Sequence, residues 1–429
     1  GESFDGHSFI EQAIANGASA IVVDKLHANL PVAQLLVNDT TRALGEISSL
    51  IREQFKGVLV AVTGSCGKTS VKGLLRNIFE LAGNTLATEG NFNNHIGVPL
   101  TLNKLLPSHQ YAVIEMGASG CDEIAYLANM AKPHISLVNN VRPAHVGGFG
   151  SIESIAQEKG KIYDALNNTK NAVAIINYDD AYAPQYIEQT KHLTQLAFSL
   201  NAKPTQTDIA LVYATDIHSD SSGLCQFAVN YKGQKQTVSL NVLGEHFVAN
   251  ALAATACALA AGLSLNTIVK GLGLYMGEKG RMQKMPSLYP SQKAIVINDA
   301  YNANPASVRA AIDYLATQHK QNNSNHHQTI LVLGDMGELG ESEVYEHKAV
   351  GTYALKNSVT HLVAIGDLAA IAAKAFGKGK VFKDLSSAAA WLGEHLNSEA
   401  TIILKGSRSA GMEKLIPLLS EYCKEQYQC

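Results

Sequence analysis

The stretch AVTGSCGKTS, residues 61–70, lies where one hydrophobic pattern gives way to another. Residues 58–64 form a continuous apolar run that is typical of a buried parallel strand, and the apolar residues of 71–78 recur with helical spacing. Backbone N–H groups at the start of a helix are unpaired and lie at the positive end of its dipole, so they favour phosphate oxygens. The stretch therefore predicts a phosphate-binding loop within an α/β fold.

Individual residues of this stretch match the parts of such a loop. Glycines let the backbone wrap closely around a phosphate, Lys68 offers a positive charge to the β- and γ-phosphates, and Thr69 offers a hydroxyl to Mg²⁺. Val62 stands where the pattern G-x-x-x-x-G-K-[ST] has its first glycine, so the match is incomplete. The alternative is a glycine-rich turn with an exposed lysine, but the strand before and the helix after favour a phosphate site. The residues predicted to bind it are Gly64, Ser65, Cys66, Gly67, Lys68, Thr69 and Ser70.

Composition limits the classes of protein to which the chain can belong. A chain of 429 residues is longer than a single hydrophobic core usually organises, so two or three domains are expected. A formal net charge of −3 gives no basic field, which argues against a nucleic-acid partner. The six cysteines form no C-x-x-C pair and read as free thiols in a reducing cytoplasm. The longest apolar segment, residues 251–262, is too short to cross a membrane.

Three domains are predicted from the order of the patterns along the chain. Residues 1–55 read as a small α/β piece that ends in a helix over 41–55, and we expect part of this domain to lie outside the given sequence. Residues 56–290 alternate strands and helices, then continue into a segment, 209–243, that reads as an antiparallel meander, and an alanine-rich helix over 250–261. Residues 291–429 repeat the βα alternation.

Two polar residues follow neighbouring strands of the central domain. Glu115 closes the strand 111–117, and a carboxylate at the carboxyl edge of a parallel sheet is suited to hold Mg²⁺ between phosphates. His145 follows the next strand, 135–140, within the segment NNVRPAHVGGFGS. A loop histidine is the simpler interpretation of His145, but its place beside the same sheet edge favours a role in the site.

Lys159 lies on the apolar face of the helix predicted over 151–166. A charged lysine on a buried face is costly unless it is paired or neutralised. One hypothesis is a salt bridge. The other is that a neutral amine combines with CO₂ to give a carbamate, which would turn a cation into a metal-binding anion.

With these motifs in place, the chain resembles the Mur ligases, which are ATP-dependent amide-bond-forming enzymes of peptidoglycan precursor synthesis. The resemblance spans nearly all 429 residues and rests on motifs in a shared order: TGSCGKTS, ATEGNFNNHIGVPLTL, VIEMGAS, AHVGGFGSIESIAQEKGKI, GEHFVANALAA, GRMQ, NDAYNANPASVRAAI, VLGDMGELG and KGSRSAGME. It implies a three-domain architecture, with a domain that holds a UDP-sugar, a central P-loop ATPase domain with a parallel sheet, and a C-terminal Rossmann-like domain that closes over the site.

The resemblance also implies roles for single residues. Thr69 and Glu115 would hold one Mg²⁺, and His145 with carbamylated Lys159 would serve a second. Catalysis would rest on Lys68, Glu115, His145, Lys159 and Arg281, and ATP would also contact Asn250, Arg281 and Asp299. The dipeptide would be bound by Tyr301, Asn302, Asn304, Ser407 and Arg408. The family has a further asparagine where this chain has Phe247, which puts one adenine contact in doubt.

Within the family, the absence of a D-N-P-R motif argues against the ligase that adds diaminopimelate, and the motifs NDAYNANPAS and KGSRSAGME favour the one that adds a dipeptide. The implied substrates are UDP-MurNAc-tripeptide and D-Ala-D-Ala, joined by a cytoplasmic monomer. Two alternatives stay open here. One is a folylpolyglutamate synthase-like ligase, and the other is a P-loop regulatory module that binds nucleotide without catalysing ligation.

Overall fold

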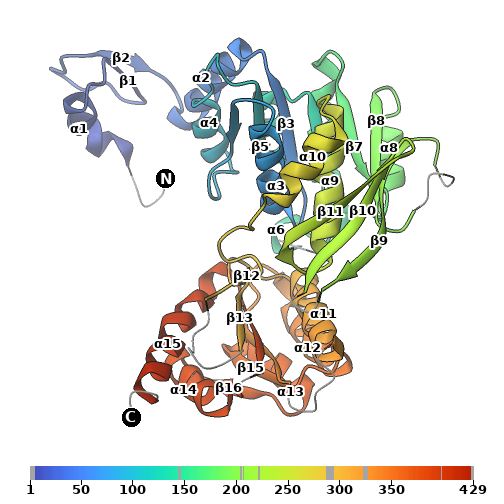
Figure 1. Cartoon of the computed structure of the whole chain (residues 1–429). Coiled ribbons are helices and arrows are strands. Elements are labelled where there is room, and N and C mark those ends of the chain that lie inside the picture. Colours follow the sequence, from blue (N-terminus) through green and yellow to red (C-terminus); the bar gives the residue numbers. More distant parts are fainter. Residues whose placement is uncertain are drawn as a thin grey trace.

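The computed structural model describes residues 5–143, 146–202, 205, 207–220, 223–286, 294–321, 327–397 and 399–426. Figure 1 shows three parts in chain order, a small N-terminal unit, a large central unit and a C-terminal unit below it. Of the described helices, none is long and apolar enough to cross a lipid bilayer.

The N-terminal unit consists of two short helices followed by a two-stranded parallel sheet. It contains η1 (Gly6–Phe9), α1 (Ile10–Ala15) and two short parallel strands, β1 (Ala20–Val23) and β2 (Ala33–Leu36). The helix α2 (Thr40–Gln54) leads from it to the central unit, and Asp39 caps that helix by accepting hydrogen bonds from two of its first N–H groups. The helix was predicted over residues 41–55, and both of its ends lie one residue earlier than predicted.

The central unit is built on one sheet of nine strands in the order β11-β10-β9-β8-β7-β6-β3-β5-β4. The predicted meander is antiparallel, but it extends the parallel sheet, because β9 pairs with β8 in parallel. The strands are β3 (Val58–Thr63), β4 (Thr85–Ala87), β5 (Tyr111–Glu115), β6 (Ile135–Val138), β7 (Val173–Asn177), β8 (Thr194–Ser199), β9 (Ala210–Ser219), β10 (Leu224–Tyr231) and β11 (Gln234–Leu243).

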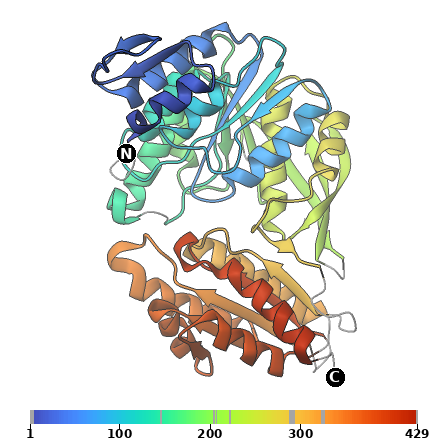
Figure 2. The ribbon, with the colours of Figure 1, turned by 90° about the vertical axis from the view of Figure 1, so that its left-hand side faces the viewer.

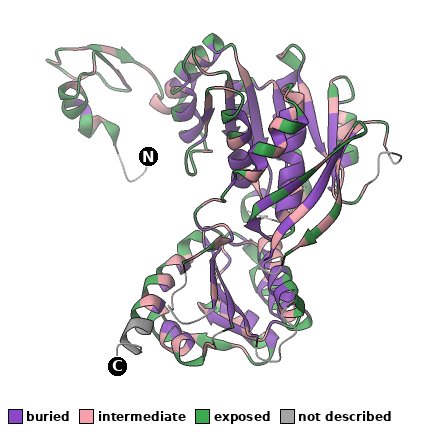
Figure 3. Cartoon of the chain, in the orientation of Figure 1, coloured by how far each residue is buried: buried purple, intermediate pink, exposed green. Residues whose placement is uncertain are grey.

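Helices cover both faces of this sheet, and Figure 3 shows its strands buried between them. One face packs on α3 (Lys68–Glu80), α9 (His246–Ala260) and α10 (Leu265–Gly273). The helices on or around the other face are α4 (Gly97–Leu102), α5 (Glu123–Ala131), α6 (Val146–Phe149), α7 (Ile152–Asp164), η2 (Ala165–Asn168) and α8 (Ala183–Gln189). The predicted start of the alanine-rich helix was wrong: α9 begins at His246, four residues earlier, because Phe247 and Val248 are buried in the core and continue its apolar face.

The C-terminal unit has a six-stranded sheet in the order β12-β13-β17-β14-β15-β16, parallel except for β12. Figure 2, turned from Figure 1, shows helices on both sides of it. Its strands are β12 (Gln283–Lys284), β13 (Ile295–Asn298), β14 (Thr329–Gly334), β15 (His361–Ile365), β16 (Lys380–Phe382) and β17 (Thr401–Lys405). Its helices are α11 (Pro305–Gln321), η4 (Gly340–Ser342), α12 (Glu343–Lys356), α13 (Asp367–Phe376), α14 (Leu385–His395), η5 (Arg408–Ala410), η6 (Met412–Lys414) and α15 (Leu415–Gln426).

Candidate active site

A cavity of about 790 Å³ opens at the carboxyl edge of the central sheet, where the C-terminal unit meets it. Its walls come from the loop after β3, the ends of the neighbouring strands, α9, the connection before β12, and the loop after β13. The cavity brings together most of the predicted site residues, namely Ser65, Cys66, Gly67, Lys68, Thr69, Ser70, Glu115, Asn250, Arg281, Asp299, Tyr301, Asn302, Asn304 and Arg408. Gly64, Lys159 and Ser407 do not line it, and His145 lies outside the described residues.

The loop after β3 needs glycine at one position for two independent reasons. Gly67 is the N-cap of α3 and has a left-handed backbone, with φ of 80°. A Cβ atom at this position would lie 2.4 Å from Asn250 Oδ1 and 2.6 Å from Asn139 Nδ2.

The side chain of Lys68 folds back over the loop, where its Nζ donates to the Gly64 carbonyl at 2.7 Å. Desolvation lowers the pKa of Lys68, and the nearby Glu115 carboxylate opposes that shift.

One buried carboxylate lies beside this loop with an unused oxygen. Glu115 is 2% exposed, and its Oε1 accepts from Asn93 Nδ2 at 2.9 Å and from Thr69 Oγ1 at 3.3 Å. Its Oε2 has no hydrogen-bond partner among the described residues. A buried carboxylate oxygen beside a threonine hydroxyl is an oxygen donor set that fits Mg²⁺. The residues present therefore suit the metal that the sequence predicts here.

Lys159 lies behind the cavity, on the buried face of α7. It is 3% exposed, and no ion pair joins it to any residue that the structure describes. Burial, together with the charge of nearby Lys68, lowers the pKa of Lys159 to about 7. The salt bridge that was one hypothesis for Lys159 is therefore not found among the described residues. A large fraction of the amine is neutral at physiological pH.

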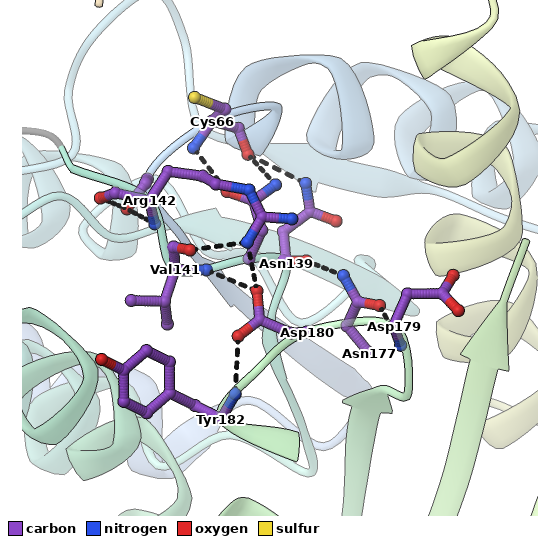
Figure 4. Close-up of polar contacts among 10 residues, drawn as sticks. Cys66, Asn139, Val141, Arg142, Asn177, Asp179, Asp180 and Tyr182 are labelled. Atoms are coloured by element: carbon purple, nitrogen blue, oxygen red, sulfur yellow. Dashed lines mark hydrogen bonds and ion pairs between the residues drawn. The ribbon is translucent and has the colours of Figure 1, made fainter. Parts of the chain in front are cut away.

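The loop after β6 is joined to the phosphate loop by Asn139 and Asn140, and Figure 4 labels Asn139 and its partner Cys66. Asn139 Nδ2 and Asn140 Nδ2 both donate to the Cys66 carbonyl, at 2.9 and 3.1 Å. Asn140 Oδ1 also accepts from the Cys66 N–H at 2.9 Å, and Asn139 Nδ2 reaches Asn250 Oδ1 at 3.1 Å. These contacts fix the position of the loop relative to the end of β6 and to α9.

The C-terminal wall of the cavity is held by a buried ion pair. Lys405 is 2% exposed, and its Nζ donates to Asp299 Oδ2 at 2.6 Å and to the Asn302 carbonyl at 3.1 Å. Asp299 Oδ1 in turn accepts from the Met282 N–H at 3.1 Å. Sequence reasoning missed Lys405, although it ends a parallel strand within the motif KGSRSAGME, and its place at a strand end was the available signal.

Two contacts join the C-terminal side to the phosphate loop directly. Arg281 Nη2 donates to Thr69 Oγ1 at 2.8 Å, while its guanidinium lies 4.3 Å from the centre of the Tyr301 ring. Asn304 Nδ2 lies 3.2 Å from Cys66 Sγ. The Tyr301 ring also has Arg408 at 5.8 Å. Ser407 is buried beneath this wall, where its Oγ bonds Ser409 Oγ and its N–H donates to the Asp335 carbonyl.

Comparison with known proteins agrees with this geometry. The Mur ligase middle domain family matches residues 62–258, and the Mur ligase glutamate ligase domain family matches residues 280–408. The UDP-N-acetylmuramoyl-tripeptide–D-alanyl-D-alanine ligase of Escherichia coli (strain K12) is 38% identical over 98% of this chain and 89% of its own length. The corresponding ligase of Bacillus subtilis is 33% identical over 98% of this chain and 89% of its own length. A crystal structure of MurF from Acinetobacter baumannii is 36% identical, with a TM-score of 0.88, over 98% of this chain and 89% of that one.

The fold and these comparisons together identify an ATP-dependent amide-bond-forming ligase with a central P-loop domain, in which a second α/β unit forms one wall of the cavity. The chain belongs to the Mur ligase family. This confirms the predicted family and the α/β architecture with its parallel sheets. Within the family, its relatives are the ligases that add D-alanyl-D-alanine, which argues against the folylpolyglutamate synthase and regulatory-module alternatives.

Proposed function

We propose that the chain is the ATP-dependent ligase that joins D-alanyl-D-alanine to UDP-N-acetylmuramoyl-tripeptide, giving the pentapeptide, ADP and phosphate. The observation that carries this proposal is the single cavity that holds both the phosphate loop and polar residues of the C-terminal unit. A nucleotide seated on the loop would thus face residues able to bind a second substrate. We assign the reaction to the cytoplasm, where ATP is available.

In this proposal the nucleotide site consists of the phosphate loop, the end of β5, and Arg281 in the connection before β12. Backbone N–H groups of residues 64–70 and the Lys68 ammonium bind the phosphates, and Thr69 with Glu115 would hold Mg²⁺, which neutralises phosphate charge when bound. The Arg281 guanidinium bonds the Thr69 hydroxyl, and we assign it to the γ-phosphoryl group. Asn250 and Asp299, on opposite walls, contact the nucleoside.

Lys159 serves the site as a carbamate in this proposal. Its low pKa supplies the neutral amine that attacks CO₂, the Nζ–C bond forms, and one proton leaves to solvent. The carbamate anion, with His145, would hold a second Mg²⁺. Lys159 is buried on α7, and the charges of Lys68 and Cys66 in the phosphate loop act on its amine, which supports a place for the carbamate near that loop.

The dipeptide site lies on the C-terminal wall. Arg408 is exposed, presents a planar donor fork suited to a carboxylate, and lies near the Tyr301 ring. Asn302 and Asn304 line the same cavity, whereas Ser407 is buried and does not line it. In domain terms, residues 1–55 belong to the UDP-sugar side, 56–290 to the ATPase and 291–429 to the dipeptide side.

The reaction proceeds in two balanced steps. The terminal carboxylate of the tripeptide attacks the γ-phosphorus, the bond to the β-phosphate oxygen breaks, and an acyl phosphate and ADP form. The free amine of D-Ala-D-Ala then attacks the acyl carbon, phosphate leaves, and the amine loses a proton. Both steps gather negative charge on oxygen, so Lys68 and Arg281 act by positioning and electrostatic stabilisation. Closure of the C-terminal wall keeps water from the intermediate.

A phosphate-release assay coupled to mass spectrometry tests this proposal. We expect phosphate and pentapeptide only when ATP, UDP-MurNAc-tripeptide and D-Ala-D-Ala are all present. Leaving out the dipeptide should still allow an acyl phosphate that borohydride reduces to an alcohol. Phosphate release that needs neither peptide substrate would contradict the assignment.

A further inference from the structure

Arg142 lines the nucleotide cavity, but none of the roles above uses it. Its main chain is bonded to the phosphate loop in both directions. The Arg142 N–H donates to Ser65 Oγ at 2.9 Å, and that hydroxyl donates to the Arg142 carbonyl at 2.9 Å. Residue 142 is therefore fixed relative to the loop on which the phosphates would sit.

A buried carboxylate holds one edge of the Arg142 guanidinium, as Figure 4 shows. Arg142 Nη1 donates to Asp180 Oδ2 at 2.9 Å and to the Val141 carbonyl at 2.7 Å. The Asp180 side chain is 2% exposed, and its oxygens also accept the N–H groups of Val141 and Tyr182. An aspartate committed in this way cannot follow a moving arginine, so it acts as a fixed anchor.

The other edge of the guanidinium is left for a ligand. Nε and Nη2 make no hydrogen bond to any residue that the structure describes, and the side chain is 41% exposed at the cavity wall. Arg281 contacts the loop at Thr69, whereas Arg142 contacts it at Ser65. The Arg281 guanidinium thus bonds the loop directly, whereas the main chain of Arg142 bonds it and leaves the Arg142 guanidinium at the cavity wall.

We propose that Arg142 binds a non-bridging oxygen of the nucleotide β- or γ-phosphate, with Asp180 as the residue that positions it. This inference rests on the proposed function, because it takes the loop to hold ATP. A guanidinium with one edge anchored and one edge free forms strong, directed hydrogen bonds to oxyanions. The loop residues 65–70 and Arg142 line the same cavity, so a phosphate held by the loop is the oxyanion that we assign to this guanidinium. The carboxylate of the peptide substrate is the other oxyanion of the reaction.

Equilibrium binding of Mg·ADP, a non-hydrolysable Mg·ATP analogue and AMP to the R142Q variant tests the role of Arg142. Loss of a charged hydrogen bond predicts about 10- to 100-fold weaker binding of ADP and of the ATP analogue, with AMP affected less than twofold. R142K should recover part of the loss. The matched control is R309Q, since Arg309 is similarly exposed and is also paired with one carboxylate, that of Glu346, but lies outside the cavity. R309Q should bind all three ligands as the wild type does.

The D180N variant tests the positioning role. It should weaken ADP binding in the same direction as R142Q, and the double variant should be no weaker than R142Q alone, since both changes remove one interaction. A purely structural role would instead lower all three affinities by one factor, and that result would overturn the proposal.

Two further outcomes separate this inference from the proposed function. If R142Q binds ADP within twofold of the wild type but loses affinity for UDP-MurNAc-tripeptide, Arg142 binds the carboxylate and the proposal is wrong. If the wild-type protein itself fails to bind Mg·ADP, the proposed nucleotide site fails, and the Arg142 proposal fails with it.

Discussion

The two α/β units each bury a lysine near the shared cavity, and the two lysines differ in their partners. Lys405, in the C-terminal unit, is 2% exposed and bonds Asp299 and two backbone carbonyls. Lys159, in the central unit, is 3% exposed and has no ion pair among the described residues. A paired buried charge holds structure, whereas an unpaired amine is forced toward its neutral form and becomes available for chemistry.

Replacement of Lys159 gives the largest expected effect. K159M should lower the ligation rate by at least about 1,000-fold, because it removes the anion proposed to hold a metal at the site of phosphoryl transfer. Steady-state assays measure the loss, and circular dichroism should show an unchanged fold. A short carboxylic acid added to a K159A variant should restore part of the rate.

The matched control for this change is K161M, two residues along the same helix. Lys161 bonds Asp122 and Glu158 and lies outside the cavity, so its loss should change ligation only a few-fold. Near wild-type turnover in K159M would remove the carbamate from the mechanism.

Replacement of Lys405 should act on stability instead. K405M leaves the buried Asp299 carboxylate unpaired, which costs about 3–5 kcal/mol of unfolding free energy. Chemical denaturation, followed by the fluorescence of the single tryptophan Trp391 in the C-terminal unit, measures this loss. K414M, at an exposed lysine nearby, serves as control and should change stability by less than about 0.5 kcal/mol. Equal stability of K405M and K414M would show that the ion pair is dispensable.

Chemical denaturation of K159M, followed by circular dichroism so that the signal includes the central unit, should give the opposite sign. The folded state lowers the pKa of Lys159 from 10.5 to about 7, so between these values the unfolded chain binds one more proton. The unfolding free energy of the wild type therefore rises with pH across this window. In buffer free of CO₂ and metal, K159M should be more stable than the wild type by about 1–4 kcal/mol at pH 7, and the gain should vanish above about pH 10.5. A destabilised K159M at pH 7 would mean that Lys159 has a partner.

The last prediction concerns the pH dependence of ligation. Below its pKa of about 7 the Lys159 amine must lose a proton before it reacts with CO₂, and carbamate formation releases a second proton, so the rate should fall by about tenfold to 100-fold for each pH unit below 7. Initial rates of ligation at a fixed concentration of dissolved CO₂ measure this fall in rate below pH 7. Mg·ADP affinity, followed in parallel, should vary less over the same range. A flat rate profile between pH 5 and 7 would argue against a titrating Lys159.

Much of the fold and part of the site could be predicted from local patterns. The phosphate loop was readable because strand, glycine spacing, lysine, threonine and helix follow one another within about twenty residues. Glu115 and Lys159 were readable because a strand end and a helical stripe fix where a side chain points. The start of α9 could not be predicted from such a pattern, because Phe247 and Val248 are held in the helix by packing against the sheet and not by a capping side chain.

Contacts between distant segments could not be predicted. Lys405 finds Asp299 across 106 residues, Arg281 reaches Thr69 across 212, and Arg142 meets Asp180 across 38. Single-sequence periodicity gives the face on which a side chain lies, but it gives no partner on another element.

The sequence by itself determined the βα alternation and the chemistry of the phosphate loop, since each depends on residues that are close together along the chain. It also determined the family, because each motif is short and the order of the motifs can be read along the chain. Tertiary structure decided which buried charges are paired and which are free, because pairing depends on the distance between side chains from separate elements. The unused oxygen of Glu115, the unpaired amine of Lys159 and the anchored guanidinium of Arg142 all belong to this second kind. The pairing of charges across elements therefore distinguishes the structural groups at the cavity from those available to a substrate.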